Sequence, residues 1–116
     1  MFTELLIGGE SYKLKLTTKT SIMLERALGY NPISMLLDVE KGKMPKLNDV
    51  LIILQAMLQT YHHGLNMDKV YDLFDKYVED GGSMFDLIPV FVEVFEHSGY
   101  ISSKQASEGE DEEGKN

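Results

Sequence analysis

The fold class depends on how one stretch folds, "SMFDLIPVFVEVFEHSG" at residues 83–99. Its central valines and phenylalanines alternate, so the apolar spacing alone leaves a strand and a helix open. Ser83 and Asp86 form a capping-box pattern that opens a helix, and Gly99 is placed to end it. We therefore predict a helix, in which Pro89 lies past the first turn, removes one backbone hydrogen bond and bends the axis.

Upstream of this stretch, four more helix patterns are separated by residues that start or stop helices. Thr17-Thr18, Asn31-Pro32 and Asn66 are placed to begin helices, and Gly29 and Gly64 to end them. The predicted helices cover residues 19–28, 32 to near 42, 49–63 and 67 to near 80. The third of these has apolar residues over a broad face, so we predict that it is the central and most buried helix.

The N-terminal residues 2–17 predict a β-hairpin with a tight turn in Gly8-Gly9-Glu10. Apolar and lysine residues alternate in the second strand, which gives it one buried and one exposed face. A loop at Gly9-Glu10 would pair Leu5 with Leu14, whereas a loop at Gly8-Gly9 keeps the same faces and shifts the pairs. Both registers remain open. A lone hairpin is marginal in water, so its apolar face must rest on the helices.

These patterns predict a mainly α fold of the α+β class, with the hairpin packed on a bundle of about five helices. The length of 116 residues fits one domain, which we place at residues 1–101. From Ser102 onward the apolar content collapses, and an acidic block runs from Glu110 to Glu113. Residues 102–116 are therefore predicted to be a disordered acidic tail.

Charge and composition exclude several classes of function. The formal net charge is -8, which argues against nucleic-acid binding and favours a basic partner. The chain has no cysteine and no apolar run near the ~20 residues of a membrane helix. Its N-terminus lacks the basic start of a signal peptide. We therefore expect a cytoplasmic protein that does not bind a membrane.

The sequence shows no clear pattern of metal-binding or catalytic residues. His62 and His63 are adjacent, and neighbours on a helix point about 100° apart, so they do not form a two-ligand zinc face. We find no nucleophile constellation and no cofactor motif. The sequence thus predicts a protein that is not an enzyme and that has no catalytic residue, metal or cofactor.

The partner-binding hypothesis rests on the apolar stretch near the C-terminus and on the hairpin. One interpretation of the stretch is a core helix covered on most sides. The other is a helix with part of its apolar face exposed to another protein. On the second interpretation, the predicted partner-binding residues are Leu87, Val90, Phe91, Val94 and Phe95, with Tyr12 and Leu14 of the hairpin as a second surface.

Residues 11 to about 100 resemble the tail assembly chaperones of long-tailed phages and related prophages of Gram-positive bacteria. The resemblance lies in the order of the elements and in a few motifs. The segments that carry it are "YKLKLTTKTSIMLERALGYNPI", "MPKLNDVLIILQAMLQTYHHGL" and "VYDLFDKYVEDGGSMFDLIPVFVEVFEHSGY". The motifs are the Leu28-Gly29-Tyr30-Asn31-Pro32 turn, the Tyr61-His62-His63-Gly64 helix end and the Glu79-Asp80-Gly81-Gly82-Ser83 link.

The resemblance implies a non-enzymatic chaperone in the host cytoplasm that is absent from the finished virion. It would bind the tape measure protein, a very long helical protein, and recruit tail tube subunits, with self-association left open. A second hypothesis is a small acidic inhibitor that occludes a basic site on a host protein. A third is an unrecognised hydrolase.

Overall fold

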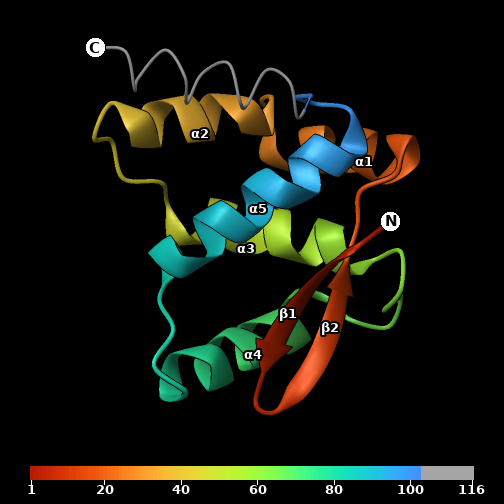
Figure 1. The fold of residues 1–116 in the computed structure, drawn as a ribbon, viewed down its shortest axis with the longest axis vertical. Coiled ribbons are helices and arrows are strands. Elements are labelled where there is room, and N and C mark those ends of the chain that lie inside the picture. The colour runs from red at the N-terminus through yellow and green to blue at the C-terminus, as the bar shows by residue number, and fades with distance from the viewer. Residues whose placement is uncertain (103–116) are drawn as a thin grey trace.

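The computed structural model describes residues 1–102 and has the predicted fold class, an N-terminal hairpin followed by helices (Figure 1). The predicted acidic tail lies, apart from Ser102, outside the described residues. The strands are β1 (Thr3–Ile7) and β2 (Glu10–Leu14). The helices are α1 (Thr18–Leu28), α2 (Pro32–Glu40), α3 (Leu47–Leu58), α4 (Met67–Glu79) and α5 (Met84–Ser98).

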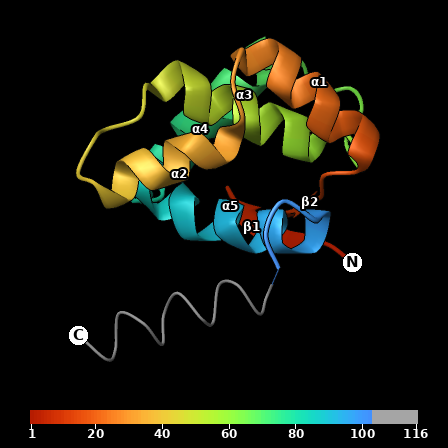
Figure 2. The same ribbon diagram turned by 90° about the horizontal axis from the view of Figure 1, so that it is seen from above.

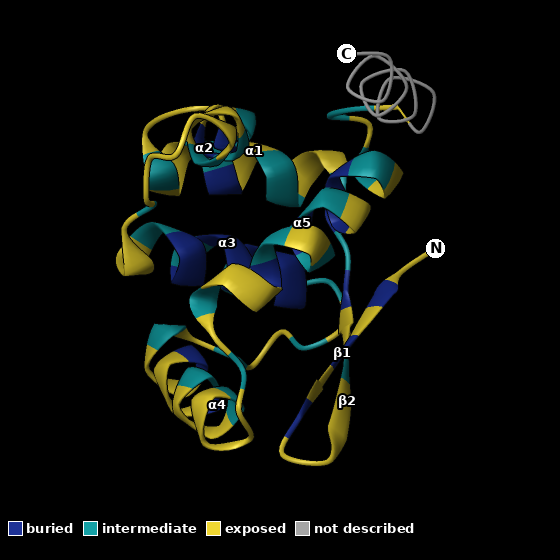
Figure 3. Ribbon diagram, turned by 60° about the vertical axis from the view of Figure 1, so that its left-hand side comes forward, coloured by how far each residue is buried: buried dark blue, intermediate teal, exposed yellow. Residues whose placement is uncertain are grey.

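Helix α3 forms the centre of the molecule, as predicted. It contacts α1, α4, α5 and strand β2. Because apolar side chains cover most of its circumference, burying them requires neighbours on several sides. Figure 3 shows most of α3 in the colour of buried residues, whereas α4 is largely exposed. The buried residues of α3 are Val50, Leu51, Ile53, Leu54, Ala56, Met57 and Leu58.

The predicted helix starts are confirmed by their capping hydrogen bonds. Thr17 accepts from the Thr20 N–H in a capping box that begins α1, Asn31 caps α2 with Pro32 in the first turn, and Asn66 caps α4. Ser83 and Asp86 form the second capping box, at the start of α5. These side chains accept from N–H groups that have no partner inside the helix.

The predicted end of α3 is wrong. The helix ends at Leu58 and not at His63, because the following residues turn toward the hairpin and the next loop. The Thr60 hydroxyl donates to the Lys15 carbonyl oxygen over 3.4 Å. The His62 imidazole Nε2 accepts from the Lys13 N–H over 3.0 Å. These tertiary contacts replace the last turn that the local pattern predicts.

The hairpin turns at Gly8-Gly9, which confirms the second of the two predicted loops and corrects the first. The register places Leu5 opposite Tyr12 and Thr3 opposite Leu14. Both turn residues have positive φ, 59° for Gly8 and 80° for Gly9, as a type I′ turn requires. Glycine adopts these angles without a steric cost, whereas the Gly9-Glu10 loop would place a glutamate there.

The outer edge of β2 is attached to the end of α3. The Lys15 N–H donates to the Met57 carbonyl oxygen over 2.9 Å, next to the bond from Lys13 to His62. At the tip of the hairpin, the Gly8 N–H donates to Asp80 Oδ2 at the end of α4 over 2.9 Å. The helices thus supply the stabilising contacts that a two-stranded sheet lacks on its own.

Helix α5 is continuous from Met84 to Ser98, so the helix prediction for this stretch is confirmed over the strand. Pro89 lies on an exposed face, where solvent can reach the carbonyl that it leaves without a partner. Gly99 ends the helix with a φ of 91°. Tyr100 then fixes the helix to α1, because its hydroxyl donates to Glu25 Oε2 over 2.6 Å.

Candidate functional site

Five of the seven predicted partner-binding residues lie in the hydrophobic core, each with at most 1% of its surface exposed: Leu14, Leu87, Phe91, Val94 and Phe95. Val90 and Tyr12 are half-buried. The first interpretation of this stretch, a core helix covered on most sides, is therefore confirmed, and the exposed apolar face of the second interpretation is corrected. The spacing of residues 87, 91, 94 and 95 forms a single helix face, and this element packs against α3 and β1.

Open apolar surface lies instead along a groove between α1 and α3, which Figure 2 shows side by side in the half of the molecule opposite α5. The groove has a volume of about 160 Å³. Each helix contributes one face over about two turns, since the lining positions recur every three or four residues. The lining residues are Thr20, Met23, Leu24 and Ala27 of α1, with Ile52, Gln55, Ala56 and the adjoining Gln59 from the α3 side.

The α3 side of this groove is uncharged and held in place. The side-chain amides of Gln55 and Gln59 donate to the carbonyl oxygen of Leu65, over 3.3 and 2.8 Å. These bonds turn both glutamines toward the loop before α4. Ile52 and Ala56 are the apolar residues on this side of the groove. This side of the groove therefore presents apolar side chains with a fixed polar border.

The α1 side is formed by Met23 and Ala27 above buried Leu24. Met23 is 52% exposed and Ala27 is also exposed, although both point toward the groove. A methionine side chain adapts to irregular apolar partners because it is unbranched and flexible. The Thr20 hydroxyl is already used in the capping box of α1. The groove is thus suited to apolar contact and not to acid–base chemistry.

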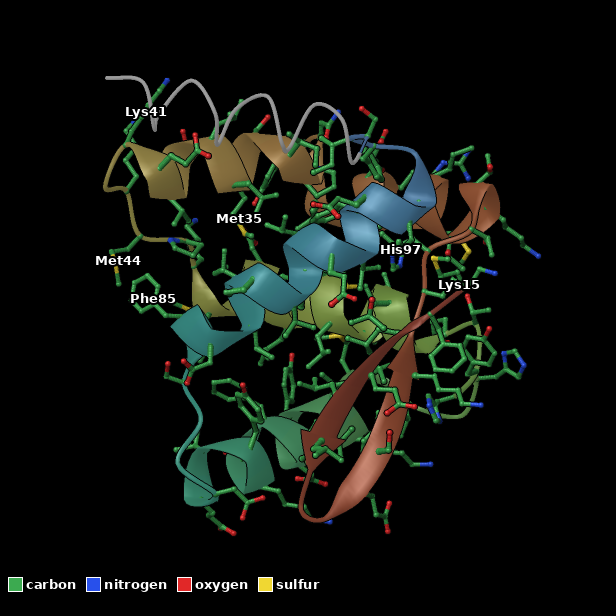
Figure 4. All side chains as sticks on the ribbon, in the orientation of Figure 1. Lys15, Met35, Lys41, Met44, Phe85 and His97 are labelled. Atoms are coloured by element: carbon green, nitrogen blue, oxygen red, sulfur yellow. The ribbon has the colours of Figure 1, made fainter. Side chains whose placement is uncertain are left out.

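A second, larger cleft of about 430 Å³ lies between α2 and the link to α3. Tyr30, Asp38 and Asp49 line it, together with apolar side chains of which Met35 and Met44 are labelled in Figure 4. The Tyr30 hydroxyl donates to Asp49 Oδ2 over 2.8 Å. Burial, that hydrogen bond and repulsion from the two carboxylates raise the pKa of Tyr30 to about 12.

An aromatic cluster surrounds the start of the hairpin. The Phe2 and Tyr61 rings meet edge to face, with centroids 5.8 Å apart, and the Lys13 ammonium lies 4.8 Å from the Phe2 centroid. The Tyr12 ring lies 5.3 Å from the His62 ring. His62 is therefore part of the hairpin attachment. In residues 1–102, no group of three or more His, Asp or Glu side chains could hold a metal ion.

The α1–α3 groove was not predicted from the sequence, although a weak signal exists. Thr20, Met23 and Ala27 recur at a spacing of three and four residues, which places small or apolar side chains along one face of a polar helix. That pattern is equally typical of a face packed against a neighbour. The sequence cannot reveal that the neighbour, α3, leaves part of this face open.

Comparison with known proteins gives one match. Residues 3–113 match a family of unknown function, DUF6096. No curated protein and no solved structure matches the chain. Within residues 1–102, no helix has the length and apolar content that crossing a bilayer demands. Since the match spans nearly the whole length, the chain belongs to the DUF6096 family.

Proposed function

We propose that this protein is a tail assembly chaperone of a long-tailed phage or prophage, which binds the tape measure protein and helps to recruit tail tube subunits. It would act without catalysis in the cytoplasm of the bacterial host and leave before the virion is complete. The proposal extends the sequence resemblance, and the observation that carries it is the α1–α3 groove.

The groove supports the proposal because it is complementary to the apolar stripe that a helical client exposes. A long helical protein exposes apolar stripes before it assembles, and such stripes bind in grooves through residues spaced three or four apart. The groove is lined by one face of each helix, with Met23 as an adaptable apolar contact and Ile52 as a stiffer one. A chaperone needs contacts of this kind, which cover apolar surface without demanding a single fixed partner geometry.

Co-expression with a tape measure protein of a long-tailed phage or prophage tests the proposal. We expect the tape measure protein to move from the insoluble to the soluble fraction and to co-purify with the chaperone. The control is the same tape measure protein expressed with an unrelated acidic domain of similar size. Equal solubility with both companions would contradict the proposal.

A second candidate function is supported by the cleft at Tyr30. Asp38 and Asp49 line it together with a single cation, Lys46, and form no ion pair within residues 1–102. Asp49 accepts the Tyr30 hydroxyl, so Asp38 is the carboxylate that the cleft offers to a basic group. An inhibitor that occludes a basic site on a host protein would use such a surface. Its affinity would fall steeply as salt rises, whereas a mainly apolar chaperone contact would not change in that way.

A further inference from the structure

We infer that the α1–α3 groove binds an amphipathic helix whose apolar stripe is flanked by acidic side chains. The inference rests on the proposed function and specifies the chemistry of the client segment. It is carried by the charges that border the groove, which differ in sign from the net charge of the whole chain.

The outer lip of the groove is basic. Lys19, Met23 and Arg26 are spaced four and three residues apart, so they form one stripe along α1 with the groove residue Met23 between two cations. Lys19 and Arg26 are both exposed. Neither makes a hydrogen bond or an ion pair with any other side chain. Two unpaired positive charges therefore border the α1 side.

Neither cation forms an ion pair with the carboxylates of α1 and α3. Asp49 of α3 accepts the Tyr30 hydroxyl over 2.8 Å. Glu25 lies on the other side of α1, where it accepts the Tyr100 hydroxyl over 2.6 Å. Along the solvent-facing stripe of α3, helical spacing aligns Asn48, Ile52 and Gln55, none of which is charged. The groove thus has a basic lip and a neutral floor.

The position of a charged side chain relative to the groove decides whether a bound segment meets that charge. The formal net charge of the chain is -8, and 19 acidic residues are spread over its length. Charges more than a Debye length away, about 8 Å at physiological ionic strength, are largely screened. On the face of α1 that carries Met23, the charged side chains are Lys19 and Arg26, so acidic flanks of a helix seated against Met23 would meet these two cations.

The size of the groove sets the mode of binding. Its volume of about 160 Å³ accommodates inserted side chains and not a whole helix. The client helix would therefore lie along the opening and insert apolar anchors between Met23 and Ile52. Acidic residues beside those anchors would then face the Lys19–Arg26 stripe. This geometry matches the general mode in which an amphipathic helix lies in a groove.

The test uses the full-length protein and two labelled helical peptides with the same leucine stripe, one flanked by glutamates and one by lysines. Fluorescence anisotropy would measure both affinities at about 0.15 M salt. We expect the glutamate peptide to bind roughly tenfold more tightly, as two favourable charge contacts would give. Equal affinities, a preference for the lysine peptide, or no binding of either peptide would overturn the inference.

Matched variants locate the contact. Lys19→Gln/Arg26→Gln should abolish the preference for glutamate, whereas Lys41→Gln/Lys43→Gln makes the same change in net charge at the α2–α3 link and should leave it intact. Met23→Glu should strongly weaken the binding of the glutamate peptide. Leu37→Glu is its control, because Leu37 of α2 and Met23 are both 52% exposed. An unchanged preference in Lys19→Gln/Arg26→Gln would overturn the inference.

Co-expression separates this inference from the proposed function. If the unaltered chain solubilises the tape measure protein and the Lys19→Gln/Arg26→Gln and Met23→Glu variants do so equally well, the chaperone function stands and this binding surface is wrong. If the unaltered chain fails to solubilise it but binds the glutamate peptide selectively, the groove is a helix-binding site and the proposed function is wrong.

Discussion

Helix α5 buries its largest apolar residues, whereas helix α1 leaves apolar residues exposed. Helix α5 is rich in phenylalanine and valine, and its Phe91 and Phe95 are fully buried. Helix α1 is polar on average, yet Ile22 and Met23 are about half exposed. A helix that is apolar on most sides gains most by burial, so it becomes core. Surface for a partner remains where single apolar residues interrupt a polar helix.

The largest expected effect comes from truncating one apolar side chain in each helix and comparing the loss of stability. Phe91→Ala removes a fully buried ring and leaves a cavity, so we expect the free energy of unfolding to fall by about 3–5 kcal/mol. Met23→Ala should change it by less than about 0.5 kcal/mol, since surface substitutions seldom matter more. Urea unfolding followed by circular dichroism measures both values. Similar losses in the two variants would contradict the assignment of core and surface.

Gly82→Ala tests how the link into α5 is fixed. A Cβ at Gly82 would overlap the Tyr77 ring, so the ring or the link must move. We expect a loss of about 1–3 kcal/mol, the usual cost of overpacking. Gly64→Ala is the control, because a Cβ there meets nothing within 4 Å. Thermal unfolding would show the difference, and equal effects at the two glycines would count against the Tyr77 contact.

Tyr100→Phe tests the contact that joins the two helices of the comparison. The variant keeps the ring against Phe95, where the centroids lie 5.4 Å apart. It removes the hydroxyl, which donates to Glu25 Oε2 over 2.6 Å and more weakly to the Ser21 carbonyl oxygen over 3.4 Å. We expect a loss of about 1 kcal/mol, typical of a single hydrogen bond that is partly exposed. Tyr71→Phe, at a position that is 43% exposed, is the control. A neutral effect of Tyr100→Phe would mean that this bond does not stabilise the end of α5.

High pH should weaken the same contact. Burial, followed by the hydrogen bond to Glu25 and the charge of that carboxylate, raises the pKa of Tyr100 to about 12. The folded state then keeps a proton that the unfolded state loses near pH 10. The stability that this provides is present below about pH 10 and is lost as pH rises through 12.

The measurement for this last prediction is an ultraviolet titration of the phenolate absorbance. Of the six tyrosines, Tyr30 and Tyr100 should ionise near pH 12, and each Phe variant should remove one of these late steps. Unfolding experiments at pH 9 and pH 11 should show lower stability at pH 11. Ionisation of all six tyrosines near pH 10 would contradict the hydrogen bonds from Tyr30 to Asp49 and from Tyr100 to Glu25.

Local chemistry explains what the sequence predicted well. A helix start needs acceptors for its first N–H groups, and Thr17, Asn31 and Asn66 supply them from the adjacent chain. At the start of α5, Asp86 Oδ2 accepts from the Ser83 N–H. The glycine stops and the helix prediction for residues 83–99 depend on neighbours within a few positions. Such features require no knowledge of the rest of the fold, so a single sequence suffices to place them.

Tertiary packing explains what the sequence missed. The end of α3 depends on Lys13 and Lys15, about 45 residues away in the chain. The exposure of Met23 depends on how closely α1 approaches α3, and the burial of Phe91 on where the hairpin docks. An amphipathic pattern identifies the apolar face of a helix, but it does not state whether a neighbour covers that face.

The attachment of β2 to α3 affects the order in which a growing chain can become ordered. The hairpin is synthesised first, yet its Lys13 and Lys15 N–H groups bind His62 Nε2 and the Met57 carbonyl oxygen. A ribosome must therefore add some 45 further residues before the first strands meet their support, which takes about 2–9 s at elongation rates of about 5–20 residues/s. During this interval the earliest part of the nascent chain is only marginally stable, and it is available to any factor that waits at the exit tunnel.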